Sequence, residues 1–337
     1  MGYYKFRYYL WLKRQIKTKN TIFLVGTPVH ENIGDAAIAY SELEYLKEIL
    51  PNDTTVVEIN QNQMIEYLDV IKKVIKKDML ILLHGGGNMG DEWSKEENDR
   101  RKFMNRFSNN RMIIMPQTIF YKNENNFFES KEYYKKFDKL TIVARELESY
   151  KILKENYSND IILTPDIVLI LKNISNDLMY YTAKKEGCLI CYRNDNEISM
   201  TSQMKSRIEE ILSDKKIIVK HTDMINDGQI FSQDRFKVIK AKLKEISNAQ
   251  LVITDRLHCM VFCYLTQTPC IVFSNYNHKV IGTYEWIKDV NYIELANIDN
   301  IEEQIDRLMK IRIEKKAPII DSNSYNELEM RILNYER

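Results

Sequence analysis

The 337-residue chain has no long apolar stretch and no dominant charge. No segment reaches the roughly 18 consecutive apolar residues of a membrane-spanning helix, so we do not expect an integral membrane protein. Lys and Arg number 49 against 48 Asp and Glu, which leaves no global electric field to attract nucleic acid. These absences favour an ordinary soluble protein without a nucleic-acid partner.

Cysteine is scarce, and its positions argue against a disulfide framework. The five cysteines are Cys188, Cys191, Cys259, Cys263 and Cys270. Their odd number and apolar surroundings predict buried thiols in a reducing cytoplasm. Cys188 and Cys191 have CxxC spacing, but there is no second pair, and residues three apart in a strand face opposite sides. We therefore expect no metal at this pair. The rest of the sequence shows no clear set of metal ligands, and no cofactor is expected.

Apolar runs rich in Ile, Leu and Val alternate with segments of helical periodicity. In the first half the runs cover residues 21–28, 54–60, 79–87, 111–118, 140–146 and 161–171. A polar stretch, 172–187, interrupts the pattern, which then resumes with strands at 188–193, 216–221, 251–255 and 269–273 and helices near 201–213, 232–249 and 259–266. This βαβ alternation predicts parallel sheets with helices on both faces.

Chain length and the polar interruption together predict two domains. We expect a basic aromatic segment at 1–20, Rossmann-like domains at 21–178 and 179–315, and a C-terminal helix at 316–337. The predicted fold is α/β, with the two domains facing each other across a cleft. In such sheets, ligands bind beyond the carboxyl ends of the strands.

Residues 1–19 hold six basic residues, six aromatic residues and no acid. Two interpretations remain open for this segment. It is either a first helix packed on the domain or a helix that docks on anionic lipid head groups.

Glycines and polar residues follow several predicted strands. The first strand leads into a helix start at residues 32–35, and the third into the triple glycine 85–87, which permits close backbone approach to a ligand. Neither stretch matches the GxGxxG or P-loop patterns. The candidate ligand-binding residues at these strand ends are Asn32, Gly86, Gly87, Asn88, Asp91 and Gln117. For Asp35 and Asp91, helix capping is the structural alternative.

Two later strand ends carry arginine. Arg145 follows an apolar strand, and an ion pair with Glu146 or Glu148 is its structural alternative. Residues 255–258, Asp-Arg-Leu-His, form a strand-to-helix turn, and an extended turn would send Arg256 and His258 to the same side. The helix N-terminus and the guanidinium of Arg256 favour an anion site, beside which His258 can hold and release a proton.

Seven short motifs carry a family resemblance: ENIGDAAI, LHGGGNMGD, MPQT, VARE, TPD, ITDRLH and TPCIVFSNYNHK. Over residues 21–290 their order and spacing resemble the polysaccharide pyruvyl transferase family. The resemblance implies a GT-B-like architecture and transfer of the pyruvyl unit of phosphoenolpyruvate to a sugar, usually as a cyclic ketal on two hydroxyls. It implies that Arg145, Arg256 and His258 bind phosphoenolpyruvate, with Lys279 (or the neighbouring His278) as a later basic contact.

Phosphoenolpyruvate suits these residues, because two arginines and a helix N-terminus can hold its carboxylate and phosphate. His258 is the candidate acid for the methylene carbon, and Asp35 the candidate base for the sugar hydroxyl. The strand-end residues named above then become candidates for acceptor binding. The expected acceptor belongs to a cell-surface polysaccharide or its precursor, with a lipid link left open. The expected location is the cytoplasm or the inner face of the plasma membrane.

Two alternatives remain. A GT-B glycosyltransferase that uses a nucleotide sugar would suit the same phosphate site. A non-catalytic sugar-binding protein would leave the charged turn at 255–258 idle.

Overall fold

The computed structural model describes residues 2–18, 20–175, 178, 185–194, 200–313 and 320–334. The chain forms two compact units. Unit 1 comprises Met1–Val29, Ile38–Ile167 and Ser322–Arg337, and unit 2 comprises His30–Ala37 and Val168–Asp321. The domain boundaries predicted at 178/179 and 315/316 involve segments 179–184 and 314–319, which lie outside the described residues.

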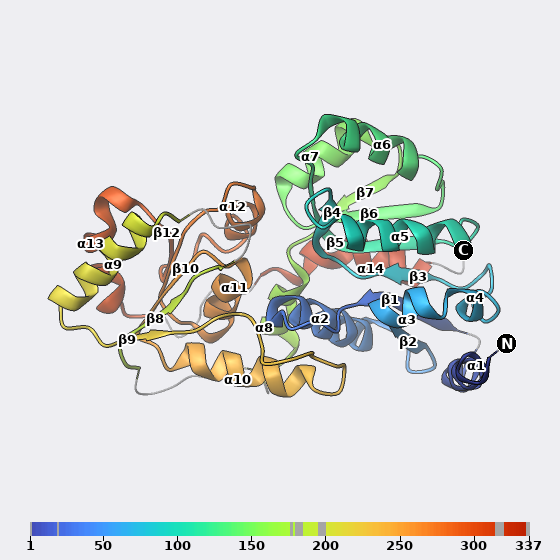
Figure 1. Cartoon of the computed structure of the whole chain (residues 1–337), viewed down its shortest axis with the longest axis horizontal. Helices are drawn as coiled ribbons and strands as arrows, with labels where there is room; N and C mark the ends of the chain where they lie inside the picture. Colours follow the sequence, from blue (N-terminus) through green and yellow to red (C-terminus); the bar gives the residue numbers. More distant parts are fainter. Residues whose placement is uncertain are drawn as a thin grey trace. The chain divides into compact units, whose positions relative to one another are not determined.

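Unit 1 is built on a parallel sheet with the strand order β2-β1-β3-β5-β6-β7, and β4 pairs with β5 (Figure 1). The strands are β1 (Thr21–Thr27), β2 (Thr55–Asn60), β3 (Ile81–Leu83), β4 (Gly86–Gly90), β5 (Met112–Phe120), β6 (Leu140–Ala144) and β7 (Asp160–Leu163). The helices are α1 (Tyr3–Gln15), α2 (Ile33–Ile49, whose first turn belongs to unit 2), α3 (Gln61–Glu66), α4 (Leu68–Ile71), α5 (Ser94–Arg106), α6 (Glu124–Tyr134), α7 (Leu147–Asn156) and α14 (Asn326–Leu333).

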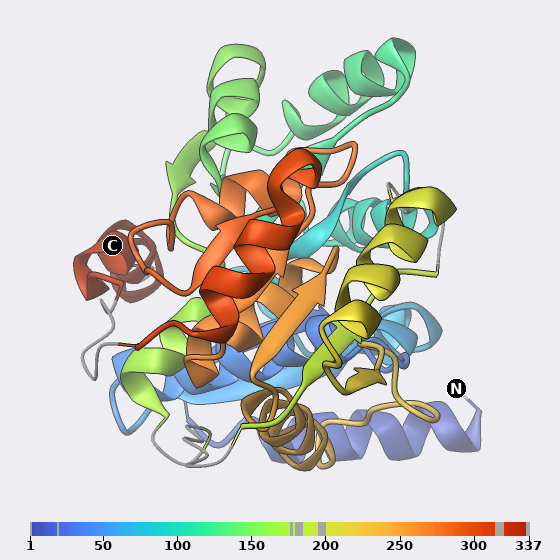
Figure 2. The same cartoon turned by 90° about the vertical axis from the view of Figure 1, so that its left-hand side faces the viewer.

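Unit 2 holds a second parallel sheet, in the order β12-β11-β10-β8-β9. Its strands are β8 (Cys188–Cys191), β9 (Val219–His221), β10 (Leu251–Thr254), β11 (Cys270–Val272) and β12 (Ile293–Leu295). Its helices are α8 (Leu171–Ile174), α9 (Ser202–Asp214), α10 (Arg235–Ser247), α11 (Leu257–Thr266), α12 (Lys279–Tyr284) and α13 (Ile301–Met309). Figure 2 shows α9 and α13 in front of this sheet, where Ile208, Leu212 and Ile305 join its core.

Both sheets change winding direction beside their first strand. In unit 1 this switch lies between β1 and β3, and in unit 2 between β8 and β10. Strands on either side of such a point send their following loops in opposite directions, which opens a ligand crevice beyond the carboxyl ends. The α/β class and the parallel sheets predicted from the sequence are confirmed.

Two strand predictions need correction. The strand expected over 161–171 ends at Leu163, and residues 167–174 form the short helices η1 (Ile167–Ile170) and α8. Periodicity cannot separate a short buried helix from a strand, and Pro165 offers no N–H to continue a ladder. The run expected over 79–87 splits into β3 and β4, with Gly86 and Gly87 inside the second strand.

Candidate active site

The turn between β10 and α11 lies at the switch point of unit 2. Asp255 is fully buried, and its Oδ1 accepts the backbone N–H of Arg193, which follows β8, at 2.7 Å. Burial raises the pKa of Asp255, although nearby donors oppose that shift. This acid therefore ties two neighbouring strand ends together, which explains its place in the turn.

Arg256 and His258 begin α11. Arg256 is the N-cap, with extended backbone, and α11 starts at Leu257, so His258 lies in the first helical turn rather than in an extended one. Arg256 is 6% exposed, and its Nη2 lies 2.6 Å from Oδ1 of the more exposed Asp223. An arginine is thus held at the positive end of a ten-residue helix.

The segment His30–Ala37 packs beside this turn within unit 2. The backbone N–H groups of Ile33 and Asn226 donate to the carbonyls of Met224 and Glu31, both at 2.8 Å. A Cβ atom on Gly34 would lie 2.8 Å from Cγ of His258 and closer still to its Nδ1. Position 34 therefore has room for glycine alone while the imidazole keeps its place.

Asn32 and Asp35 stand in this same segment. Asn32 accepts the N–H groups of Gly34 and Asp35 through Oδ1, at 2.8 and 3.3 Å, so it caps α2. The half-exposed carboxylate of Asp35 lies 3.6 Å from Nε2 of His30. Asp35 belongs to unit 2, as does His258.

The loop after β11 contributes three buried polar residues to the same edge of the sheet. Asn275, Asn277 and Lys279 are 8%, 3% and 6% exposed. Oδ1 of Asn277 accepts the N–H of Lys279 at 3.2 Å, and Lys279 opens α12. A buried lysine adds positive charge to the edge that carries Arg256 and His258.

Arg145 lies in unit 1, at the end of β6. It is buried, its Nε donates to Oγ1 of Thr118 at 2.8 Å, and its Nη1 donates to Oδ2 of buried Asp166 at 2.8 Å. The ion-pair partner is thus Asp166. Of the two acids considered from the sequence, Glu146 instead caps α7 by accepting the N–H of Ser149.

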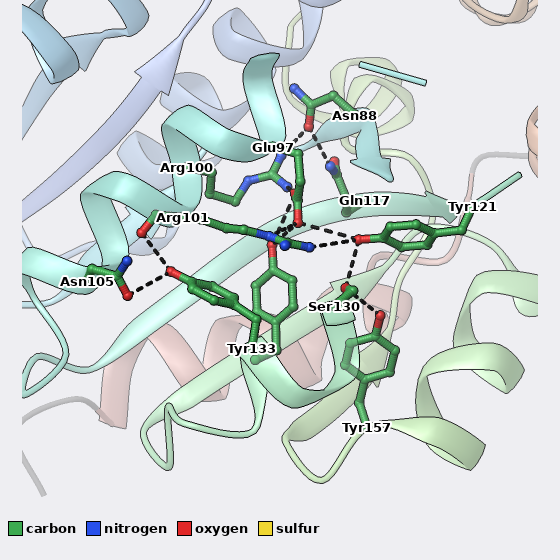
Figure 3. Close-up of polar contacts among 11 residues, drawn as sticks. Asn88, Glu97, Arg100, Arg101, Asn105, Gln117, Tyr121, Ser130, Tyr133 and Tyr157 are labelled. Atoms are coloured by element: carbon green, nitrogen blue, oxygen red, sulfur yellow. Dashed lines mark hydrogen bonds and ion pairs between the residues drawn. The ribbon is translucent and has the colours of Figure 1, made fainter. Parts of the chain in front are cut away.

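The strand β4 brings several predicted residues together in unit 1. Gly86 pairs with Gln117 across β4 and β5, and Gly86 has a φ of +118° that disfavours any side chain. Oδ1 of Asn88 accepts from Nε2 of Gln117 at 2.6 Å and also from Nη2 of Arg100 (Figure 3). Gly87 lies between these residues in β4.

Asp91 makes its hydrogen bonds to the loop that precedes α6 and to the first turn of that helix. It accepts the backbone N–H groups of Lys122 and Asn123, both at 2.9 Å, and Nδ2 of Asn126 at 3.1 Å. Burial raises the pKa of Asp91, but these hydrogen bonds outweigh it, and the pKa is lowered. Asp91 therefore fixes the loop before α6.

A buried cluster around Glu97 was missed by the sequence reasoning. Glu97 accepts from Arg100 at 2.6 Å and from Arg101 at 2.8 Å (Figure 3). It also accepts from the hydroxyl of Tyr134 at 2.9 Å. One carboxylate thus faces two guanidinium groups. Glu97 precedes Arg100 and Arg101 by three and four residues, the spacing at which ion pairs form along a helix. No such spacing relates Glu97 to Tyr134.

The sequence analysis also missed the buried pair of His84 and Glu42, at the switch point of unit 1. Nδ1 of His84 is 2.7 Å from Oε2 of Glu42, and Oε1 of Glu42 accepts the N–H of Gly85 at 2.8 Å. Both side chains are buried. Glu42 on α2 therefore fixes the imidazole at the end of β3.

Among the described residues, no group of three His, Cys, Asp or Glu side chains is arranged to hold a metal ion. No helix in the described ranges is long and apolar enough to cross a membrane.

Solved structures of similar architecture identify the fold. UDP-GlcNAc 2-epimerase from Methanocaldococcus jannaschii, solved with UDP-GlcNAc and UDP, shares 13% identity and a TM-score of 0.52, over 94% of this chain and 99% of that one. The Klebsiella pneumoniae protein KP1_0663 shares 18% identity and a TM-score of 0.57, over 88% of this chain and 100% of that one. The chain therefore has the GT-B-like fold of two Rossmann-like units.

The particular family follows from sequence. The chain belongs to the polysaccharide pyruvyl transferase family, which matches residues 32–278, and it is an enzyme of this kind. General stress protein 30 of Bacillus subtilis is 32% identical, over 88% of this chain and 87% of that protein. Pyruvyl transferase 1 of Schizosaccharomyces pombe is 24% identical, over 87% and 75%.

Proposed function

We propose that the enzyme transfers the pyruvyl unit of phosphoenolpyruvate to a sugar of a cell-surface polysaccharide or its precursor, where it forms a cyclic ketal. The observation that carries this proposal is the meeting of Arg256 and His258 at the start of α11, beyond the carboxyl end of β10. The donor offers a carboxylate and a phosphate, and arginine forks and helix N–H groups recognise both. Arg145 and Lys279 are proposed as further donor contacts.

The proposed reaction balances through two hydroxyl additions. The imidazolium of His258 protonates the methylene carbon of the donor, which leaves a cation at C2. The first sugar hydroxyl forms a C–O bond there and loses its proton to Asp35. The bond from C2 to the phosphate oxygen then breaks, and the second sugar hydroxyl forms a C–O bond to C2. The proton of this second hydroxyl leaves with the phosphate.

The proposed acceptor residues fall into two groups. Gly86, Gly87, Asn88 and Gln117 lie along β4 and β5 and offer amide and backbone groups to sugar hydroxyls. The side-chain oxygens of Asn32 and Asp91 instead accept hydrogen bonds from backbone N–H groups. We propose that these two act by shaping the loops that hold the acceptor.

The test combines binding and turnover. Calorimetric titration should show binding of phosphoenolpyruvate and no binding of UDP or GDP. Arg256→Ala should weaken donor binding by about 1.5–3 kcal/mol, and Arg256→Lys should recover only part, because a point charge cannot replace the guanidinium fork. Incubation with lipid-linked oligosaccharides should release phosphate and add the mass of a pyruvate ketal. Binding of UDP or GDP without phosphoenolpyruvate would replace this proposal with a nucleotide-sugar glycosyltransferase.

We also propose that α1 rests on anionic lipid at the inner face of the plasma membrane. Tyr8 and Leu12 are buried, and Tyr8 stacks on Tyr67 with ring centroids 4.1 Å apart, so one side of α1 is anchored to unit 1. The side chains left exposed are aromatic, aliphatic and basic, as an interfacial helix requires. They include Tyr3, Tyr4, Phe6, Arg7, Leu10, Trp11, Lys13 and Arg14.

A further inference from the structure

Buried polar atoms without a hydrogen-bond partner gather at the carboxyl ends of three neighbouring strands in unit 2. Among the described residues, they are the hydroxyl of Tyr192 after β8, Oδ2 of Asp255 after β10, and side-chain amide atoms of Asn275 and Asn277 after β11. In Asn275 both Nδ2 and Oδ1 are buried and lack a partner. These strands lie side by side in the sheet, so their ends share one edge.

Asn275 stands out against the other buried asparagines. Asn110 is also buried, but its Nδ2 donates to the carbonyls of Lys76 and Met79, at 2.6 and 3.0 Å. A buried amide that makes no hydrogen bond to the protein opposes folding unless another group supplies its partners. An apolar side chain of similar volume would fit the fold better unless a ligand supplies the missing partners.

We propose that Asn275 binds the phosphate group of the donor, with Asn277 contributing a second amide N–H. The inference rests on the proposed function, whose donor carries this group. Nδ2 of each asparagine can donate to a phosphate oxygen, and Oδ1 of Asn275 can accept from a phosphate that holds one proton. Buried Lys279 and Arg256 supply the positive charge that a neutral amide lacks. A carboxylate at neutral pH has no proton to offer Oδ1, which favours the phosphate.

The binding test uses the full chain and three probes: phosphoenolpyruvate, inorganic phosphate and lactate, whose only charged group is a carboxylate. Asn275→Ala should weaken the first two by about 10-fold or more, as loss of a hydrogen bond to a charged group does. It should leave lactate binding unchanged. Asn297→Ala, on a solvent-facing loop of the same unit, is the matched control and should bind all three probes as the wild type does.

A stability readout separates a ligand contact from a structural one. Asn275→Leu should keep or raise the melting temperature of the ligand-free protein while it loses phosphate binding. Asn110→Leu should lower the melting temperature, because it removes an amide that has two carbonyl partners.

Each outcome decides the matter. Wild-type phosphate affinity in a folded Asn275→Ala protein overturns the inference and leaves the proposed function standing. A fall in melting temperature for Asn275→Leu as large as for Asn110→Leu also overturns it, since the amide would then be structural. A wild-type protein that binds neither phosphoenolpyruvate nor phosphate overturns the proposed function and this inference with it.

Discussion

At position 34 the absence of a side chain lets the imidazole of His258 sit against the start of α2. Gly34 lies in a helical turn, so alanine suits its backbone, and the steric conflict with His258 is the main effect of Gly34→Ala. We expect turnover to fall by about 100-fold, because an ångström-scale displacement of a catalytic group costs that much. Steady-state assays with phosphoenolpyruvate and acceptor measure it. Gly2→Ala is the control, since a Cβ there meets nothing within 4 Å. Full activity in Gly34→Ala would show that the position of His258 is unimportant.

The pair of Glu42 and His84 is a residue-scale test of stability. Glu42→Ala leaves a buried imidazole and the N–H of Gly85 without their partner. We expect a loss of about 2–4 kcal/mol in the free energy of unfolding, measured by urea denaturation.

Glu44, on the same helix, provides the control for Glu42. It pairs with Lys47 at the surface, and Glu44→Ala should cost about 0.5 kcal/mol or less. Equal effects of the two substitutions would mean that the buried pair contributes no more than a solvent-screened one.

At the scale of elements, the buried residues of α1 can be tested separately from its exposed ones. The double variant Tyr4→Ser/Phe6→Ser removes exposed aromatics, so it should leave stability nearly unchanged and reduce co-sedimentation with anionic vesicles. High salt should reduce binding of the wild type as well, because it screens the basic residues. Leu12→Ala removes a buried side chain and should destabilise unit 1 by about 2–4 kcal/mol. Unchanged sedimentation of the double variant in a folded protein would leave α1 as a packing helix only.

Elements were predictable where the signal is local. Largely apolar runs predict β1, β5 and β10, because strands buried on both faces are rich in Ile, Leu and Val. The helix start after β10 was placed two residues late, because Leu257 and His258 are equally compatible with a turn. The short β12 (Ile293–Leu295) carries too few apolar residues to be recognised without its neighbour β11.

The site was less predictable than the elements. The carboxyl ends of strands pointed to Arg145, Arg256 and His258, because parallel sheets place loops there. Partners such as Asp166 for Arg145 and Asp223 for Arg256 lie 21 and 33 residues away in sequence, and no spacing rule relates them. Burial of Asn275 without a partner is a property of the folded loop alone.

At the scale of the whole molecule, the C-terminal residues complete the first unit of the chain. The hydroxyl of Tyr325 donates to the carbonyl of Asp166 at 2.9 Å, Arg331 pairs with Asp160 at 2.7 Å, and Arg111 donates to the carbonyl of Arg331 at 2.7 Å. Truncation after Asp321 should therefore destabilise unit 1 selectively. Hydrogen exchange should increase in β5, β6 and β7 and stay unchanged in β8, β10 and β11.

Arg331→Ala is the milder companion to this truncation. It removes the half-exposed ion pair with Asp160 and should raise exchange in β7 only slightly. Equal loss of protection in both units after truncation would contradict the assignment of Ser322–Arg337 to unit 1.

The cysteine thiols all lie in one of the two units. All five cysteines, from Cys188 to Cys270, belong to unit 2, and all are buried. Burial raises the pKa of Cys188 to about 12, so its reactive thiolate is scarce until the surrounding structure opens. A pulse of thiol reagent followed by mass spectrometry therefore times the opening of unit 2 alone. The native cysteines therefore report the rate at which unit 2 opens. No cysteine has to be introduced or removed in unit 1 for this measurement.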